Sequence, residues 1–254
     1  MTAASTRWAF LDWPHPIPFA HRGGGAEYPE NTMSAFAAAV DLGFRYLETD
    51  VRTTADGVVL AFHDDDLAPS TDRRGAIADL TAEQVQRARV AGERIPRLEE
   101  VLASWPDARV YVDAKDDASV APLVTVLDRT RAHDRVWVGS FYGRRVARLR
   151  ELTGGRVCTW MGRLDMARLR LASLGVPAGR FSSSCAQMPV RQGPVPLTDR
   201  RLLDAARRKG VAVHVWTIDD RHQMEGLLDL GVDGLLSNRP SLLKQVFCER
   251  GLWA

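Results

Sequence analysis

Short apolar runs alternate with amphipathic stretches along most of the chain, and this alternation constrains the fold more than any other feature. Eight runs have the length and composition of strands: residues 17–21, 45–51, 109–115, 135–140, 156–160, 180–184, 211–216 and 233–237. Strands that alternate with helical patterns are typical of βα units around a parallel sheet. Eight such units in one chain of 254 residues predict a closed (β/α)₈ TIM barrel, with residues 1–254 as a single domain.

Two of the intervening helices have recognisable ends. Residues 32–42 are expected to form a helix behind Asn31 as N-cap and to end at Gly43. A second helix is expected behind Thr198 and should end at Gly210. These caps mark boundaries and carry no information about function.

The connection between the second and third strands is too long for one βα loop. It contains a further strand-like run at 58–63, a polar stretch at 64–79, and helical patterns at 81–90 and 98–104. We therefore expect a small insertion at about 64–95. An open doubly wound sheet shares the local pattern, but "HRGGG" lacks the G-x-G-x-x-G spacing of such folds.

Charge and cysteine content exclude several classes of protein. The 34 basic and 32 acidic residues nearly balance, and no run of like charge resembles a nucleic-acid arm or a polybasic membrane patch. The three cysteines (Cys158, Cys185 and Cys248) lie far apart, in neither a disulfide framework nor a metal-binding spacing. The N-terminus lacks a signal-peptide pattern, and no stretch approaches the ~20 apolar residues of a membrane span. These features predict a cytoplasmic protein with a small-molecule ligand, no nucleic-acid partner and no stable membrane insertion; its oligomeric state is left open.

Polar side chains gather where the predicted strands end, which is the edge that carries the active site in barrels of this type. Glu48 and Asp50 project to the same side of the second strand, and Asp113 lies near the end of the third. Neighbouring carboxylates repel, and a shared cation relieves the repulsion; oxygen ligands suit Mg²⁺ or Ca²⁺. The alternative is an ion-pair network without a metal.

Two histidines and two cations face the same predicted mouth. His21 ends the first strand and His63 ends the extra strand; such a pair suits general acid and base work near neutral pH. Arg22 and Lys115 supply donors for an anion such as phosphate. Trp216, at the end of the seventh strand, is either an apolar wall for the ligand or a core residue.

Other features of the sequence have plainer interpretations. The glycines after Arg22 would let backbone N–H groups approach a ligand, but an ordinary βα turn explains them equally well. Solvent exposure or packing is expected for His15, His133 and His222.

Taken in order, the motifs "HRG", "PENT", "ETDVR", "FHD", "IPRLEEVL", "VDAK", "VWTID" and "GVDGLLSNRP" resemble the glycerophosphodiester phosphodiesterase family over about residues 18–245. The resemblance implies a (β/α)₈ barrel with an insertion after the second strand. It also implies His21 and His63 as the catalytic pair, and Arg22 and Lys115 as phosphate contacts. Glu48 and Asp50 match the family's metal ligands.

Three positions depart from the family's pattern. Asp113 stands where the resemblance implies a metal-binding Glu, which puts the identity and affinity of the metal in doubt. Arg97 stands where Thr is typical and Asn238 where Asp is common, and we expect both to affect packing or caps more than chemistry.

The resemblance implies a reaction and leaves alternatives. The expected substrate is a glycerophosphodiester left by phospholipid deacylation, hydrolysed to glycerol 3-phosphate and an alcohol with one divalent cation. We expect His21 to act as base and His63 as acid. The alternatives are a lysophospholipase-D-like enzyme, which needs an apolar surface near the rim, and a barrel that binds phosphate-bearing ligands without cleaving them.

Overall fold

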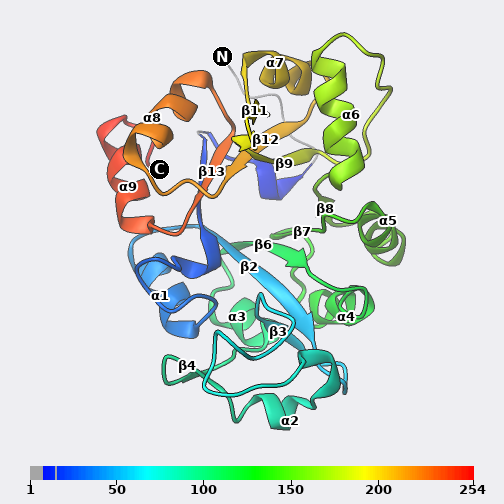
Figure 1. Cartoon of the computed structure of the whole chain (residues 1–254), viewed down its shortest axis with the longest axis vertical. Helices are drawn as coiled ribbons and strands as arrows, with labels where there is room; N and C mark the ends of the chain where they lie inside the picture. The colour runs from blue at the N-terminus through cyan, green and yellow to red at the C-terminus, as the bar shows by residue number, and fades with distance from the viewer. Residues whose placement is uncertain (1–7, 15) are drawn as a thin grey trace.

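Eight parallel strands form a nearly closed barrel in the computed structural model, which describes residues 8–14 and 16–254 (Figure 1). The strands are β1 Ile17–Ala20, β2 Tyr46–Thr53, β6 Arg109–Ala114, β7 Val136–Gly139, β8 Cys158–Thr159, β9 Cys185–Pro189, β12 Ala212–Trp216 and β13 Gly234–Ser237. Their order around the sheet is β8-β7-β6-β2-β1-β13-β12-β9, so the first and last strands of the chain pair. A single bridge between Trp160 and Cys185 joins the two ends of this order. The predicted fold class is confirmed.

Eight helices alternate with these strands and lie outside them (Figure 1). They are α1 Met33–Asp41, α3 Leu98–Ser104, α4 Val120–Thr130, α5 Gly143–Leu152, α6 Arg163–Ser173, α7 Arg200–Arg208, α8 Arg221–Leu230 and α9 Pro240–Glu249. No helix in residues 8–14 and 16–254 is long and apolar enough to cross a membrane.

Both predicted N-caps were wrong by one residue. Thr32 caps α1 by accepting the N–H of Ala35, because Asn31 has a left-handed φ of 56° and accepts a hydrogen bond from Thr49 instead. Asp199 caps α7, whereas the hydroxyl of Thr198 donates to a backbone carbonyl. In each case the side chain that we predicted as the cap, Asn31 or Thr198, forms a tertiary hydrogen bond instead, which a local sequence pattern does not reveal.

The sixth predicted strand, residues 180–184, was also misplaced. The strand is β9, Cys185–Pro189, directly after the predicted run. Gln187 interrupts the apolar pattern of β9, although its side chain is fully buried. A polar residue inside the barrel therefore concealed the strand.

An insertion follows β2, as predicted. Strand β3, Val59–Ala61, runs antiparallel to β2, and the remaining elements are a 3-10 turn at Ile77–Asp79, the short helix α2 Ala82–Val85 and the hairpin β4 Arg89–Val90 and β5 Glu93–Arg94. The helix expected over 81–90 is shorter than predicted: α2 ends at Val85, Arg89–Val90 form strand β4, and Ala91 and Gly92 take positive φ in the turn to β5. A separate apolar cluster supports the insertion: Leu60, Phe62, Leu67, Ile77, Val85, Ala88, Val90 and Ile95.

Aromatic rings fill the inside of the barrel. Phe19, Trp137 and His214 pack together, with ring centroids 4.9–6.1 Å apart. Phe10, from the 3-10 turn Ala9–Leu11, packs against Phe19 and Trp137. This packed interior confines open space to the loops at the strand ends.

Candidate active site

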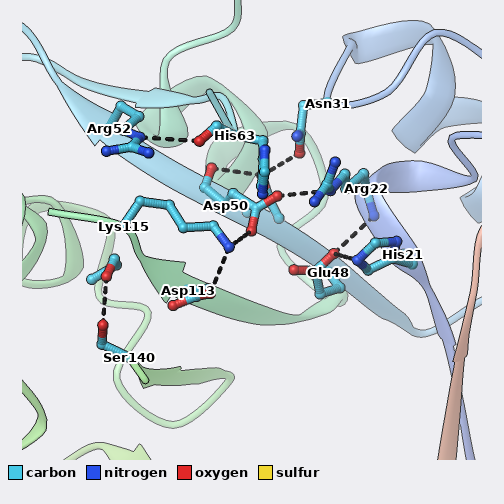
Figure 2. A network of polar contacts seen from close by, with 12 residues as sticks. His21, Arg22, Asn31, Glu48, Asp50, Arg52, His63, Asp113, Lys115 and Ser140 are labelled. Atoms are coloured by element: carbon cyan, nitrogen blue, oxygen red, sulfur yellow. Dashed lines mark hydrogen bonds and ion pairs between the residues drawn. The ribbon is translucent and has the colours of Figure 1, made fainter. Parts of the chain in front are cut away.

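One cavity of about 180 Å³ lies at the carboxyl ends of the strands. Its walls include every residue that the sequence predicts for the site: His21, Arg22, Glu48, Asp50, His63, Asp113, Lys115 and Trp216. Figure 2 shows the polar members turned toward one another from β1, β2, β6 and the insertion. We call the cavity wall formed by His21, Arg22, Glu48, Asp50, His63, Asp113 and Lys115 the charged side.

His21 follows β1 and is held by a side chain from the last strand end. Its Nδ1 lies 2.6 Å from Oδ1 of Asn238. The amide of Asn238 is oriented by Asp219, which accepts from both its Nδ2 and its backbone N–H at 2.9 and 2.7 Å. Because Asn238 therefore presents an acceptor to His21, the proton of a neutral imidazole belongs on Nδ1 and the lone pair on Nε2. Asn238 therefore contacts a proposed catalytic residue, in addition to the packing or capping role that the sequence led us to expect.

The free Nε2 of His21 faces the carboxylates. It lies 3.6 Å from Oε2 of Glu48. Burial lowers the pKa of His21 below its ordinary value and outweighs the nearby negative charge of Asp50. His21 is thus neutral near pH 7 and has an accepting nitrogen inside the cavity.

His63 reaches the cavity from the insertion. Phe62 donates its N–H to the carbonyl of Asp50, which fixes the chain after β3 beside β2. Nδ1 of His63 lies 2.8 Å from Oδ1 of Asp64, and the hydroxyl of Ser70 donates to the other oxygen of Asp64. The side chain of His63 is 35% exposed, against 12% for His21, so His63 is the more open to solvent.

Three carboxylates are buried at adjacent strand ends. Glu48 and Asp50 lie two residues apart on β2, and Asp113 is the register partner of Asp50 on β6. Burial and the charge of Asp50 raise the pKa of Glu48 well above its ordinary value. Burial likewise raises the pKa of Asp113. Burial alone would also raise the pKa of Asp50, but Lys115 and Arg22 outweigh it and lower the pKa to about 2.

The two cations of the charged side are paired with these acids (Figure 2). Nζ of Lys115 lies 2.7 Å from both Asp50 and Asp113. Nε of Arg22 lies 2.9 Å from Asp50, and its Nη1 lies 3.0 Å from Glu30. Arg22 has a left-handed φ of 52°, and its N–H donates to Glu48 at 2.9 Å. This network holds a backbone conformation that is uncommon for a residue with a side chain.

The chemistry of the carboxylates fits a divalent cation. Three acids face two cations, and Oδ1 of Asp113 is buried without a hydrogen-bond partner. Within the described part of the chain, however, no three such side chains surround a single point, because Lys115 lies between Asp50 and Asp113. A metal held here would therefore require Lys115 to shift.

Aromatic rings form another part of the cavity wall. Trp216 ends β12, and its ring lies 5.6 Å from that of Phe141, which follows β7. We call Phe141 and Trp216, with the adjoining rim residues Tyr142 and Arg163, the aromatic side. Phe141 was not predicted from the sequence; its only signal was its place directly after a strand end.

The glycines that follow Arg22 form a tight turn. Gly24 and Gly25 both donate their N–H groups to the carbonyl of His21. A Cβ at Gly23 would lie 2.9 Å from Ala35, and one at Gly24 would lie 2.7 Å from Pro240. The plainer interpretation, a βα turn, therefore explains Gly24 and Gly25.

The other described histidines lie away from the cavity. His133 faces Asp128 on an outer loop, and His222 is exposed on α8. His214 is buried in the barrel interior, and His15 lies outside the described residues. Arg97 occupies the N-cap position of α3, where its N–H donates to Glu100.

Comparison with known proteins agrees with the fold and the motifs. Residues 21–242 match the model of the glycerophosphoryl diester phosphodiesterase family. The chain is 40% identical over 251 residues to the probable glycerophosphodiester phosphodiesterase 2 of Mycobacterium tuberculosis, covering 96% of this chain and 95% of that protein. It is 28% identical to a glycerophosphodiester phosphodiesterase of Caldanaerobacter subterraneus, covering 89% and 96% of the two chains.

Solved structures share the fold at lower identity. A putative glycerophosphoryl diester phosphodiesterase from Silicibacter pomeroyi superposes with a TM-score of 0.82 at 22% identity, covering 97% of this chain and all of that one. An Oleispira antarctica phosphodiesterase in complex with its product sn-glycerol-3-phosphate gives a TM-score of 0.77 at 22% identity, covering 92% and 97%. The chain therefore belongs to the glycerophosphoryl diester phosphodiesterase family and is a phosphoric diester hydrolase.

Proposed function

We propose that the protein hydrolyses glycerophosphodiesters to glycerol 3-phosphate and an alcohol, with one divalent cation and His21 and His63 as the proton-transfer pair. The observation that carries this proposal is the meeting of both imidazoles, three carboxylates and two cations in one cavity. Family membership supports the same reaction.

The charged side suits a phosphodiester anion. Once Lys115 shifts from Asp50 and Asp113 to admit the ion, its ammonium would be free to donate to a phosphate oxygen. Arg22 stands beside it with a guanidinium that suits bidentate contact with phosphate. These two residues would stabilise the negative charge that develops on the phosphoryl oxygens.

Glu48, Asp50 and Asp113 would hold the divalent ion, Mg²⁺ or Ca²⁺. When bound, the ion supplies Lewis-acid stabilisation of phosphoryl charge. Asp113 is shorter than the Glu that is usual in the family, so we expect the affinity and preference for the ion to differ from those of relatives that carry Glu.

His21 would act as the base. It is neutral, and Asn238 leaves its Nε2 as an acceptor for the proton of the attacking oxygen, which is water or the neighbouring glycerol hydroxyl. His63 would act as the acid: Asp64 can stabilise a positive imidazolium, and the exposure of His63 suits a departing alcohol. Trp216 would contact the apolar parts of the substrate.

The direct test is release of glycerol 3-phosphate from glycerophosphocholine. We expect product with Mg²⁺ or Ca²⁺, loss of product after chelation, and recovery when the ion is returned. Absence of product with every divalent ion would contradict the proposal and favour a binding barrel. Unchanged activity after exhaustive chelation would remove the ion from the proposal but leave the reaction.

A second candidate is lysophospholipase D activity. Leu164 is exposed in the first turn of α6, at the rim, where it suits contact with lipid; the other exposed apolar residues of this segment lie at the far end of the helix: Leu171, Leu174 and Val176. A rat lysophospholipase D is 26% identical over 89% of this chain. Choline release from lysophosphatidylcholine, faster than from glycerophosphocholine, would favour this candidate.

A further inference from the structure

The aromatic side is built from two loops that pack backbone to backbone. The N–H of Arg163, the first residue of α6, donates to the carbonyl of Phe141 at 2.9 Å. Gly162 makes this approach possible, because a Cβ there would lie 2.8 Å from the backbone nitrogen of Gly143. α5 and α6 are consequently neighbours outside β7 and β8 (Figure 1), and the first turn of α6 stands at the rim.

Arg163 lies over the rings of this rim. Its guanidinium carbon is 5.4 Å from the ring centre of Phe141 and 5.7 Å from that of Tyr142. Phe141 also lines the cavity, so only the ring of Phe141 lies between the guanidinium of Arg163 and the cavity.

The positive charge of Arg163 is not balanced by a neighbouring acid. Among residues 8–14 and 16–254, no carboxylate lies within 4.0 Å of its guanidinium. The nearby Arg144 and Arg145 both pair with Asp117. Asp165, two residues after Arg163, pairs with Arg168 instead.

The two sides of the cavity therefore differ in free charge. Arg22 and Lys115 on the charged side are engaged by buried carboxylates, whereas Arg163 is exposed and unpaired at the edge of the aromatic side. A substrate whose phosphodiester lies against the charged side would direct one of its two halves toward Phe141 and Arg163. A negative group on that half would meet an available guanidinium.

We propose that Arg163 forms an anion subsite for the alcohol half of the substrate, so that diesters whose alcohol carries a phosphate or carboxylate are preferred to those with a quaternary ammonium. This inference rests on the proposed hydrolysis of glycerophosphodiesters. Aromatic walls often bind ammonium groups, but here a guanidinium already covers the rings of Phe141 and Tyr142 and would repel a second cation.

The test compares kcat/KM for bis(glycerophospho)glycerol, whose alcohol carries a second phosphodiester, with kcat/KM for glycerophosphocholine. We expect R163Q to lower the ratio of the two values about fivefold, as suits one solvent-screened charge pair, and R163K to retain most of it. The matched control is R168Q, which removes the same charge from the same helix where it pairs with Asp165. The ratio of the wild type should also fall as salt is raised, and it should fall less steeply in R163Q.

The outcomes separate this inference from the proposed function. Activity on both substrates with a ratio that R163Q and salt leave unchanged would overturn the subsite and leave the hydrolase proposal intact. Equal losses on both substrates in R163Q would also overturn it, because that result indicates only a structural role over the rings. No hydrolysis of either substrate by the wild type would defeat the proposed function and the subsite together.

Discussion

The two sides of the cavity are built on different principles. On the charged side, Asp50, Asp113 and Lys115 are fixed by one another at 2.7 Å, and neither acid has ready access to solvent. On the aromatic side, Phe141 and Trp216 meet through ring contacts, and Arg163 has no acidic partner among the described residues. The comparison suggests that one side performs the proton and charge chemistry, whereas the other discriminates among alcohols.

The largest expected difference between the two sides is the loss of activity when a histidine of the charged side is removed. His21→Ala or His63→Ala should slow turnover of glycerophosphocholine by roughly 10²–10⁴-fold, since each removes a positioned proton transfer. A diester with a nitrophenol leaving group should restore much of the rate of His63→Ala but not of His21→Ala, because such a leaving group needs no acid. His222→Ala, on the exposed surface of α8, is the control. An unchanged rate for His63→Ala on glycerophosphocholine would refute its assignment as acid.

Removal of Lys115 tests whether the charged side accepts a metal. Lys115→Met should lower the free energy of unfolding by about 3 kcal/mol, because Asp50 and Asp113 lose their shared partner. Added Mg²⁺ or Ca²⁺ should raise the melting temperature of this variant more than that of the wild type, since the ion would replace the ammonium. Equal shifts in both proteins would argue against an ion beside Asp50.

His214 lies inside the barrel, and its burial predicts how the stability of the protein depends on pH. Burial lowers the pKa of His214 to about 3 from 6.5, and neither ring nitrogen has a hydrogen-bond partner. The unfolded chain therefore binds the extra proton between these values, so stability is fully present above about pH 6.5 and falls as the pH decreases through the window. Between pH 7 and 5 the free energy of unfolding of the wild type should fall by about 2 kcal/mol more than that of His214→Phe, as measured by urea unfolding. Parallel curves would contradict this assignment.

The smallest expected effect concerns the support of His21. Asn238→Leu removes the acceptor for Nδ1 and should lower kcat about tenfold, whereas Asn238→Asp keeps an acceptor and should retain most of the activity. Nitrogen NMR of the imidazole should report Nδ1–H in the wild type and a mixture of tautomers in Asn238→Leu. A single unchanged tautomer would mean that Asn238 serves packing alone.

The charged side could be predicted from the sequence for a physical reason. Its residues lie in the carboxyl-terminal parts of strands or directly after them, and the reaction restricts them to His, Asp, Glu, Arg or Lys. The link from His21 through Asn238 to Asp219 was missed because it joins the two ends of the chain, 217 residues apart for the first pair. Closure of the barrel, which pairs β1 with β13, brings them together.

The aromatic side and the finer fold were harder to predict. Phe141 and Arg163 carry no motif, and their loops meet through tertiary contacts alone: the packing of Gly162 on Gly143 and the hydrogen bond from Arg163 to Phe141. β9 was misplaced because Gln187 is polar yet buried in the barrel. Tertiary contacts thus decided the features that local patterns did not.

The central claim is that carboxylates from two strands of the charged side bind one divalent ion. Titration of the protein with Mn²⁺, followed by electron paramagnetic resonance, tests it most directly. We predict one bound ion per chain in the wild type and at least about tenfold weaker binding in Asp50→Asn, since even the loss of a residue that only supports a ligand typically costs that much. Equal binding by the two proteins, or no stoichiometric binding by the wild type, would contradict the claim.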